Sequence, residues 1–217
     1  MNTEIARSNM VTRQLRPWMV HDEKILELFK TIPRENFVPE AYSHQAFSDI
    51  NIPLSETRET LTPREEARLI QALSIKPTDH ALEIGTGSGY ITALLASLAH
   101  SVTTVETNPE LLADSQKNLN PLSLDNIHYV SLNKFEDWEA KATYDVIVIN
   151  GSLPELPENL KNSLAIGGRL VCILGQNELM SAQLLTKASH DQWLQQVLFE
   201  TKVSSLLNTQ QNQQFHF

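Results

Sequence analysis

Cysteine is the scarcest residue type in this 217-residue chain, which contains only Cys172. Its neighbours form the apolar run Leu170–Leu174, which is typical of a buried strand. A single cysteine excludes an intrachain disulfide and a cysteine-based metal site. The sequence also offers no convincing metal-ligand cluster and no convincing catalytic triad, so we predict that the protein binds no metal.

Basic residues and long apolar runs are also scarce. Lys and Arg number 17 against 26 Asp and Glu, which gives a net charge of −9. Phosphate binding requires clustered basic side chains, so we expect no nucleic-acid partner. No apolar run is as long as a membrane span, and residues 1–30 lack the apolar centre of a signal peptide. We therefore expect no membrane partner and a cytoplasmic location.

Glycine occurs seven times, and three glycines fall within residues 82–90, Leu-Glu-Ile-Gly-Thr-Gly-Ser-Gly-Tyr. The pattern predicts a buried strand, a tight turn and the start of a helix. Glycines let the backbone N–H groups of such a turn approach a ligand, and the helix N-terminus adds a partial positive charge. A nucleotide-like ligand is therefore expected. The third glycine of the dinucleotide motif would fall at Tyr90, which disfavours a nicotinamide cofactor.

A carboxylate follows where this hypothesis requires one. Residues 101–106 predict a second strand that ends at Glu106, about 20 residues after the first glycine, and an acid there can bind both ribose hydroxyls. The alternative is that the glycines form only a structural turn and that Glu106 is a solvated strand end.

The segment before the glycine strand predicts helices and irregular structure. The pattern of residues 1–32 predicts two helices with a break at Pro17, and Asp22 is the predicted N-cap of the second helix. Residues 33–62 are irregular and rich in proline, and long irregular segments are often functional. Thr62 is predicted to cap a helix that starts at Pro63, with Glu65 completing a capping box. We expect this segment to form a lid over the carboxyl edge of the sheet.

The remaining pattern alternates between strands and helices. Strands are expected at 78–84, 101–106, 126–132, 144–150, 170–174, 193–207 and 215–217, with a loop at 208–214; helices are expected at 91–99, 109–119, 157–163 and 178–188. This order predicts an α/β fold with a doubly wound, mostly parallel, seven-stranded sheet, an N-terminal helical lid and an antiparallel last strand. We expect one domain over 1–217, in which 1–77 form the lid and substrate side and 78–217 form the cofactor-binding core.

The chain resembles the protein-L-isoaspartate O-methyltransferase family along nearly its full length. The resemblance rests on Met10-Val11 with Gln14-Leu15, on the segments 33–39 (Pro-Arg-Glu-Asn-Phe-Val-Pro) and 82–90, on Val105-Glu106, and on 144–147 and 167–171. It implies a class I methyltransferase fold with S-adenosylmethionine as cofactor. The implied reaction methylates the free carboxylate of an isoaspartyl residue in a damaged protein or peptide, as a repair step.

The resemblance also implies roles for individual residues. The glycine loop would lie under the methionine part of the cofactor, and Glu106 would bind its ribose. The expected cofactor-binding residues are Glu83, Gly85, Thr86, Gly87, Ser88, Gly89, Glu106, Thr107, Asn133 and Asn150. Thr62 and Asp49 are expected to line the acceptor site as catalytic residues. An isoaspartyl carboxylate is ionised at neutral pH, so this chemistry needs no general base.

The chain departs from the family pattern at two places. Where the family carries Gly-x-Gly-Gln-Thr-Ile-Ser, residues 56–62 read Glu-Thr-Arg-Glu-Thr-Leu-Thr, and Thr62 replaces the serine. Where it carries Gly-Asp-Gly, residues 132–134 read Leu-Asn-Lys. Two alternatives therefore stand beside isoaspartyl methylation: a methyltransferase of the same fold with another acceptor, and a cofactor-binding protein without transfer activity. The sequence leaves the oligomeric state open.

Overall fold

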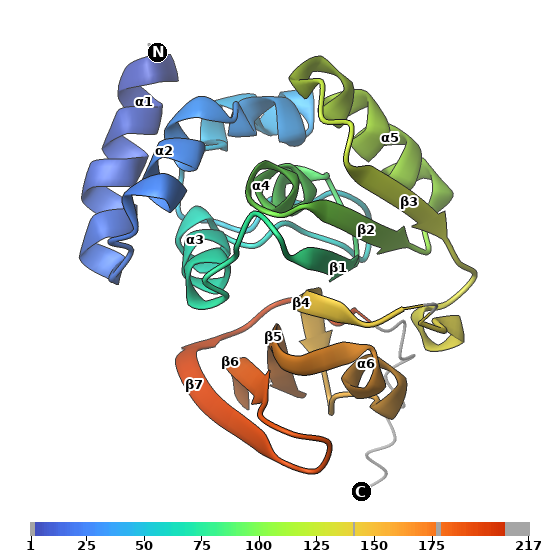
Figure 1. Cartoon of the computed structure of the whole chain (residues 1–217). Coiled ribbons are helices and arrows are strands. Elements are labelled where there is room, and N and C mark those ends of the chain that lie inside the picture. Colours follow the sequence, from blue (N-terminus) through green and yellow to red (C-terminus); the bar gives the residue numbers. More distant parts are fainter. Residues whose placement is uncertain (1–2, 141, 177–178, 207–217) are drawn as a thin grey trace, which may run out of the picture.

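The computed structural model describes residues 3–140, 142–176 and 179–206, and its centre is one sheet with the strand order β3-β2-β1-β4-β5-β6-β7 (Figure 1). The strands are β1 (His80–Ile84), β2 (Ser101–Glu106), β3 (Ile127–Ser131), β4 (Tyr144–Leu153), β5 (Leu164–Gln176), β6 (Leu179–Lys187) and β7 (Trp193–Thr201). The α-helices are α1 (Thr3–Met10), α2 (Glu23–Thr31), α3 (Pro63–Ala72), α4 (Tyr90–Leu98), α5 (Pro109–Leu119) and α6 (Glu158–Asn162). Shorter helical turns cover Val11–Leu15, Arg16–Trp18, Arg34–Phe37, Glu40–Gln45, Asn120–Leu122 and Phe135–Asp137.

The first five strands are parallel, and their order reverses beside β1. The chain adds β2 and β3 on one side of β1, and then returns to add β4 and β5 on the other side. In sheets of this kind, ligands bind outside the carboxyl ends of the strands at the point of reversal. The predicted doubly wound, mostly parallel sheet is confirmed, and its ligand edge lies at the ends of β1 and β4.

Both faces of β4 are covered, which explains its uninterrupted apolar sequence. Val146 and Val148 pack into one hydrophobic core, together with residues of α2, α3 and α4. Ile147 and Ile149 point to the opposite face and join a second core that contains Leu160 of α6. The central strand therefore connects two cores.

The helix predicted over residues 178–188 is wrong, because Leu179–Lys187 form strand β6. Leu, Met, Ala and Gln favour helices, but this propensity is a weak one. β6 pairs antiparallel with β5 on one side and with β7 on the other. Its side chains alternate between the faces, since Ala182 and Leu184 join one core and Leu185 joins the other. Pairing on both edges outweighs the local preference.

The last strands of the sheet are antiparallel, which confirms the predicted class of sheet, but the pairing is made by β6 with β5 and β7, whereas the sequence indicated strands at 193–207 and 215–217. The strand predicted over 193–207 ends earlier, because β7 spans Trp193–Thr201. The predicted loop at 208–214 and strand at 215–217 lie outside the described residues.

The N-terminal segment folds as its cap and break signals predict. The side chain of Asp22 accepts a hydrogen bond from the backbone N–H of Lys24 and caps α2. Thr62 and Glu65 form the reciprocal capping box of α3. Contacts run in succession from α1 to α2, α3 and α4, so this segment extends the helical layer on one side of the sheet (Figure 1).

Candidate functional site

The turn after β1 is a loop with three glycines in left-handed backbone conformation. The φ angles are +91° at Gly85, +53° at Gly87 and +86° at Gly89, a region that residues with a side chain rarely adopt. Gly89 is the N-cap of α4. The loop therefore presents backbone N–H groups beside a helix N-terminus, which favours a polar or anionic ligand group.

Glu106, at the end of β2, fixes this loop. Its side chain is buried, and its carboxylate accepts hydrogen bonds from the backbone N–H groups of Gly87 at 2.9 Å, Thr107 at 2.8 Å and Asn108 at 3.1 Å. A carboxylate has about four acceptor positions, so one position remains for a ligand hydroxyl. Glu106 therefore ties the glycine loop to β2 and can still accept one further hydrogen bond.

Glu83, in β1, is completely buried beneath the loop. Its carboxylate accepts hydrogen bonds from the hydroxyls of Thr92 and Thr104 and from the side-chain amide of Asn150. Burial raises its pKa to about 7, although the three hydrogen bonds oppose that shift. Glu83 does not line the pocket described below, so in this structure it orients the groups that do.

Asn150, in β4, has a side-chain amide of fixed orientation. Its Nδ2 group donates to Glu83 Oε1 at 2.6 Å and to the carbonyl of Gly85 at 3.0 Å. Both partners are acceptors, so the nitrogen of the amide must face them. Asn150 Oδ1 is buried and accepts no hydrogen bond from the described residues. The site therefore contains an acceptor that a ligand donor could satisfy.

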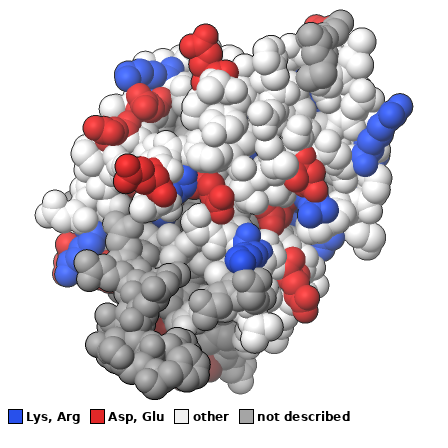
Figure 2. All heavy atoms as spheres, turned by 180° about the vertical axis from the view of Figure 1, so that it is seen from behind, with Lys and Arg blue, Asp and Glu red and all other residues white. Residues whose placement is uncertain are grey.

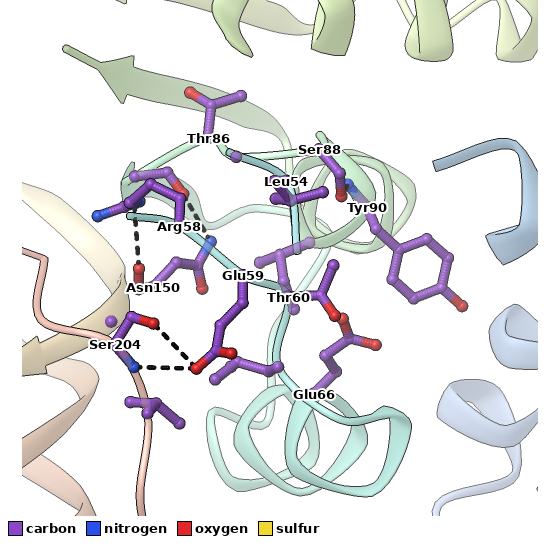
Figure 3. A pocket seen from close by; sticks show the side chains of 16 residues that line it. Leu54, Arg58, Glu59, Thr60, Glu66, Thr86, Ser88, Tyr90, Asn150 and Ser204 are labelled. Carbon is purple, nitrogen blue, oxygen red and sulfur yellow. Dashed lines mark hydrogen bonds between the residues drawn. The ribbon is translucent and has the colours of Figure 1, made fainter. Parts of the chain in front are cut away.

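A pocket lies over the carboxyl ends of β1 and β4 (Figure 3). It is lined by residues from the segments 54–66, 85–91, 150–151 and 203–204. Its cavity volume is about 40 Å³, which accommodates only a few water molecules. Within the predicted N-terminal extension, the segment 54–66 supplies the lining residues, whereas α1 and α2 lie outside the lining.

Two side chains from distant parts of the chain meet over Gly85. A Cβ atom on Gly85 would lie 2.8 Å from Nη2 of Arg58 and 2.8 Å from Cδ1 of Leu206. The Arg58 guanidinium donates to the carbonyl oxygens of Leu206 at 3.3 Å and of Asn150 at 3.4 Å. Burial lowers the pKa of Arg58, and the nearby charge of Glu106 opposes that shift. Arg58 thus places a partly desolvated positive charge against the glycine loop.

The segment that contains Leu206 is held in place by Glu59 and by β4. The Glu59 carboxylate accepts hydrogen bonds from the backbone N–H and the hydroxyl of Ser204 at 3.2 and 2.9 Å (Figure 3). Ser152 exchanges backbone hydrogen bonds with Ser204 and Leu206. Sequence reasoning missed Ser204 and Leu206, because they lie more than a hundred positions from Glu59 and carry no local motif.

The structure brings together half of the predicted cofactor-binding residues in the pocket lining: Gly85, Thr86, Gly87, Ser88 and Asn150. The others are not among the lining residues: Glu83, Gly89, Glu106, Thr107 and Asn133. Glu83 and Glu106 lie behind the loop and hold it, and Gly89 is the last glycine of the loop and the N-cap of α4. Asn133 follows β3 and is exposed.

Neither of the two predicted catalytic residues lines the pocket. Thr62 is buried in the capping box of α3 and does not line the cavity, whereas its neighbours Thr60 and Leu61 do. Asp49 forms an ion pair with Arg64, in which Oδ1 of Asp49 lies 3.0 Å from Nε of Arg64.

Among the described residues, no group of three or more His, Cys, Asp and Glu side chains could hold a metal ion. No helix in the described ranges is long and apolar enough to cross a membrane.

Comparison with known proteins gives a consistent result. The family model described as protein-L-isoaspartate(D-aspartate) O-methyltransferase matches residues 6–210. A Geobacter metallireducens protein named protein-L-isoaspartate O-methyltransferase is 37% identical over 175 residues, which cover 81% of each chain. A Cronobacter sakazakii protein of the same name is 34% identical over 183 residues, 84% of this chain and 88% of that relative.

Among solved structures, a Plasmodium falciparum chain described as a beta-aspartate methyltransferase in complex with S-adenosyl-L-homocysteine has a TM-score of 0.76. It is 23% identical, and the match covers 95% of this chain and 98% of that one. This likeness establishes a shared fold over nearly the whole of both chains.

Proposed function

The chain belongs to the protein-L-isoaspartate O-methyltransferase family, and from this premise we propose that it transfers the methyl group of S-adenosylmethionine to the free carboxylate of L-isoaspartyl residues in damaged proteins. The methyl ester then closes to a succinimide, which reopens partly as normal aspartate, so the activity is one of protein repair. The structural observation that carries the proposal is the glycine loop, bound to Glu106 at the point where the strand order reverses.

The residues at this edge fit the cofactor. The glycine loop offers backbone N–H groups, Glu106 retains an acceptor position for a ribose hydroxyl, and Asn150 Oδ1 is a buried acceptor in need of a donor. When bound, S-adenosylmethionine supplies a methyl group activated on a sulfonium. Arg58 and Leu206 lie against the glycine loop, each 2.8 Å from a Cβ atom placed on Gly85, so we expect both side chains to move when the cofactor binds.

The ionisable groups of the pocket suit a reaction that needs no general base. The carboxylate of Glu66 is paired with buried Arg34, and that of Glu59 is hydrogen bonded to Ser204. The acceptor carboxylate has an ordinary pKa of about 4 and is already ionised at neutral pH. The task of the protein is then to align the carboxylate oxygen with the methyl group at about 3 Å and to exclude water.

We assign the two sides of the site to the two parts of a single domain. The core, residues 78–217, would hold the cofactor through Gly85, Gly87 and Glu106. The extension, residues 1–77, would present the acceptor through the segment 54–66, with Thr62 and Asp49 beside it. The lining of the pocket by residues 54–66 supports this division.

The partner of the acceptor side is a protein or peptide that carries isoaspartyl residues, and no nucleic acid. The net charge of −9 supports this assignment. On the face drawn in Figure 2, the Lys and Arg side chains are scattered among Asp and Glu and do not form a continuous basic surface. Nucleic-acid binding needs such a surface.

The test is methyl transfer from labelled S-adenosylmethionine to an isoaspartyl peptide, compared with the same peptide containing normal aspartate. We expect transfer to the isoaspartyl peptide only. Transfer to neither peptide, with S-adenosylhomocysteine still bound in calorimetry, would refute isoaspartyl methylation. The second candidates are then methylation of another acceptor and a binding role without transfer. Arg58 and Glu59 favour them, because these residues depart from the family pattern in the segment 56–62.

A further inference from the structure

Arg58 is half-buried and, unlike the fully buried Arg34, makes no ion pair with a carboxylate of the described residues. The Arg34 guanidinium donates to both carboxylate oxygens of Glu66, at 2.9 and 3.1 Å, and to the carbonyl oxygens of Ala46 and Leu61. Arg58 donates only to the carbonyl oxygens of Leu206 and Asn150, at 3.3 and 3.4 Å. Within the described ranges, therefore, Arg58 has no carboxylate in direct contact, and the charge of Glu106 acts on it only from a distance.

Two acids near Arg58 in the site, Glu106 and Glu59, direct their hydrogen bonds to other groups. Glu106 directs its oxygens to three backbone N–H groups. Glu59, the next residue in the chain, binds Ser204. The nearest aromatic ring, that of Phe135, has its centroid 5.8 Å from the guanidinium carbon, so it contributes only a weak cation–π interaction. A ligand carboxylate is the group that would complete this environment.

An unpaired acceptor lies beside this unpaired donor. Asn150 accepts from Arg58 through its backbone carbonyl and carries the buried, unsatisfied Oδ1 atom on its side chain. In Figure 3 the Asn150 amide lies between Arg58 and Glu59, on the wall of the pocket. A cation beside a neutral acceptor is complementary to a group that carries both a carboxylate and an ammonium, which is the α-amino acid group.

We propose that Arg58 binds the carboxylate of the amino acid end of S-adenosylmethionine and that Asn150 Oδ1 accepts from its ammonium group. This inference rests on the proposed function, because it deepens the assignment of the cofactor pocket. Arg58 then selects ligands that carry the amino acid end, and it does so from a segment, 56–62, in which the family pattern has no arginine. The guanidinium leaves two long hydrogen bonds when it turns to the ligand, so that movement costs little.

The experiment measures ligand affinity by isothermal titration calorimetry and does not depend on turnover. Two ligands are compared: S-adenosylhomocysteine, which has the amino acid end, and 5′-methylthioadenosine, which lacks it. The variants are Arg58→Met and Arg58→Lys, with Arg16→Met as the matched control. Arg16 makes an exposed ion pair with Glu23 on the N-terminal segment and is not among the residues that line the pocket.

Arg58→Met is expected to weaken S-adenosylhomocysteine binding about 10- to 100-fold, as for one lost charged hydrogen-bond pair, and to change 5′-methylthioadenosine binding less than about threefold. Arg58→Lys keeps the charge but loses the forked donor, so it should fall between Arg58→Met and the wild type. Arg16→Met should bind both ligands as the wild type does. The Tm of Arg58→Met should not fall, because the substitution removes a half-buried charge that has no ion-pair partner.

Other outcomes overturn the inference in distinct ways. Equal weakening of both ligands by Arg58→Met would make Arg58 a structural residue of the pocket. Unchanged S-adenosylhomocysteine affinity, together with a raised KM for the isoaspartyl peptide, would assign Arg58 to the acceptor carboxylate. In both of these cases methyl transfer by the wild type remains, so the proposed function stands. A wild type that binds no S-adenosylhomocysteine would refute the inference and the proposed function together.

Discussion

The side-chain amide of Asn150 donates a 2.6 Å hydrogen bond to Glu83, which joins the end of β4 to the buried interior of β1. Glu83 is the innermost acid of the site, and its pKa is raised to about 7 mainly by burial. Because this bond turns Nδ2 of Asn150 toward Glu83, Oδ1 is the amide atom that remains without a partner in the pocket wall.

We predict that Glu83 makes the protein less stable as the pH rises from about 4.5 to about 7. An acid whose pKa is raised by folding binds more protons in the folded state, so the free energy of unfolding falls across that interval. The shift to about 7 corresponds to a loss of up to about 3 kcal/mol. Glu83→Gln should remove this dependence, as measured by urea denaturation at several pH values. Parallel pH profiles for the variant and the wild type would refute the prediction.

Gly87→Val should abolish S-adenosylhomocysteine binding while most of the protein remains folded. At a φ of +53°, a branched side chain costs about 1–2 kcal/mol, and a Cβ atom there lies 3.4 Å from Leu54 in the pocket. Gly167→Val is the matched control, since Gly167 has a φ of +80° and no atom within 4 Å of an added Cβ. Both variants should lose similar stability in thermal unfolding. If Gly87→Val bound the ligand as well as Gly167→Val does, the assignment of the glycine loop would be wrong.

Glu106→Ala should lower both stability and cofactor affinity. The substitution leaves three backbone N–H groups without their acceptor, so we expect a loss of about 2 kcal/mol in the free energy of unfolding. Affinity should fall for S-adenosylhomocysteine but not for an analogue without ribose hydroxyls, as measured by calorimetry. Equal losses for the two ligands would mean that Glu106 acts only by supporting the loop.

The sequence could predict those features of the site that depend on residues close together in the chain. The glycine loop, the strand-end Glu106 and the Thr62–Glu65 capping box all depend on residues close together in the chain, and each lies where it was predicted. The seven-stranded, mostly parallel sheet followed from the alternation of elements, and it is confirmed.

The parts that could not be predicted depend on long-range pairing. β6 has the composition of a helix and becomes a strand because β5 and β7 flank it. Leu206 reaches Gly85 only because Ser204 is hydrogen bonded to Glu59 and to β4, and no periodicity in the sequence encodes that contact. The position of Arg58 over the glycine loop follows from the same long-range packing.

Thr62 offers a test that separates a structural role from a catalytic one. Its hydroxyl caps α3 by accepting from the backbone N–H of Glu65, so Thr62→Ala should lower the free energy of unfolding by about 1 kcal/mol, whereas Thr62→Ser should keep most of it. A purely structural Thr62 would leave kcat/KM for the isoaspartyl peptide unchanged in folded Thr62→Ala. Because Thr62 lies beside Thr60 and Leu61 of the pocket lining and matches the position of the family serine, we expect kcat/KM to fall at least tenfold in Thr62→Ala and to recover in Thr62→Ser. The control is Thr60→Ser, which preserves a hydroxyl in the pocket lining and should retain activity. If Thr60→Ala lost activity while Thr62→Ala kept it, Thr60 would be the residue whose hydroxyl contacts the acceptor.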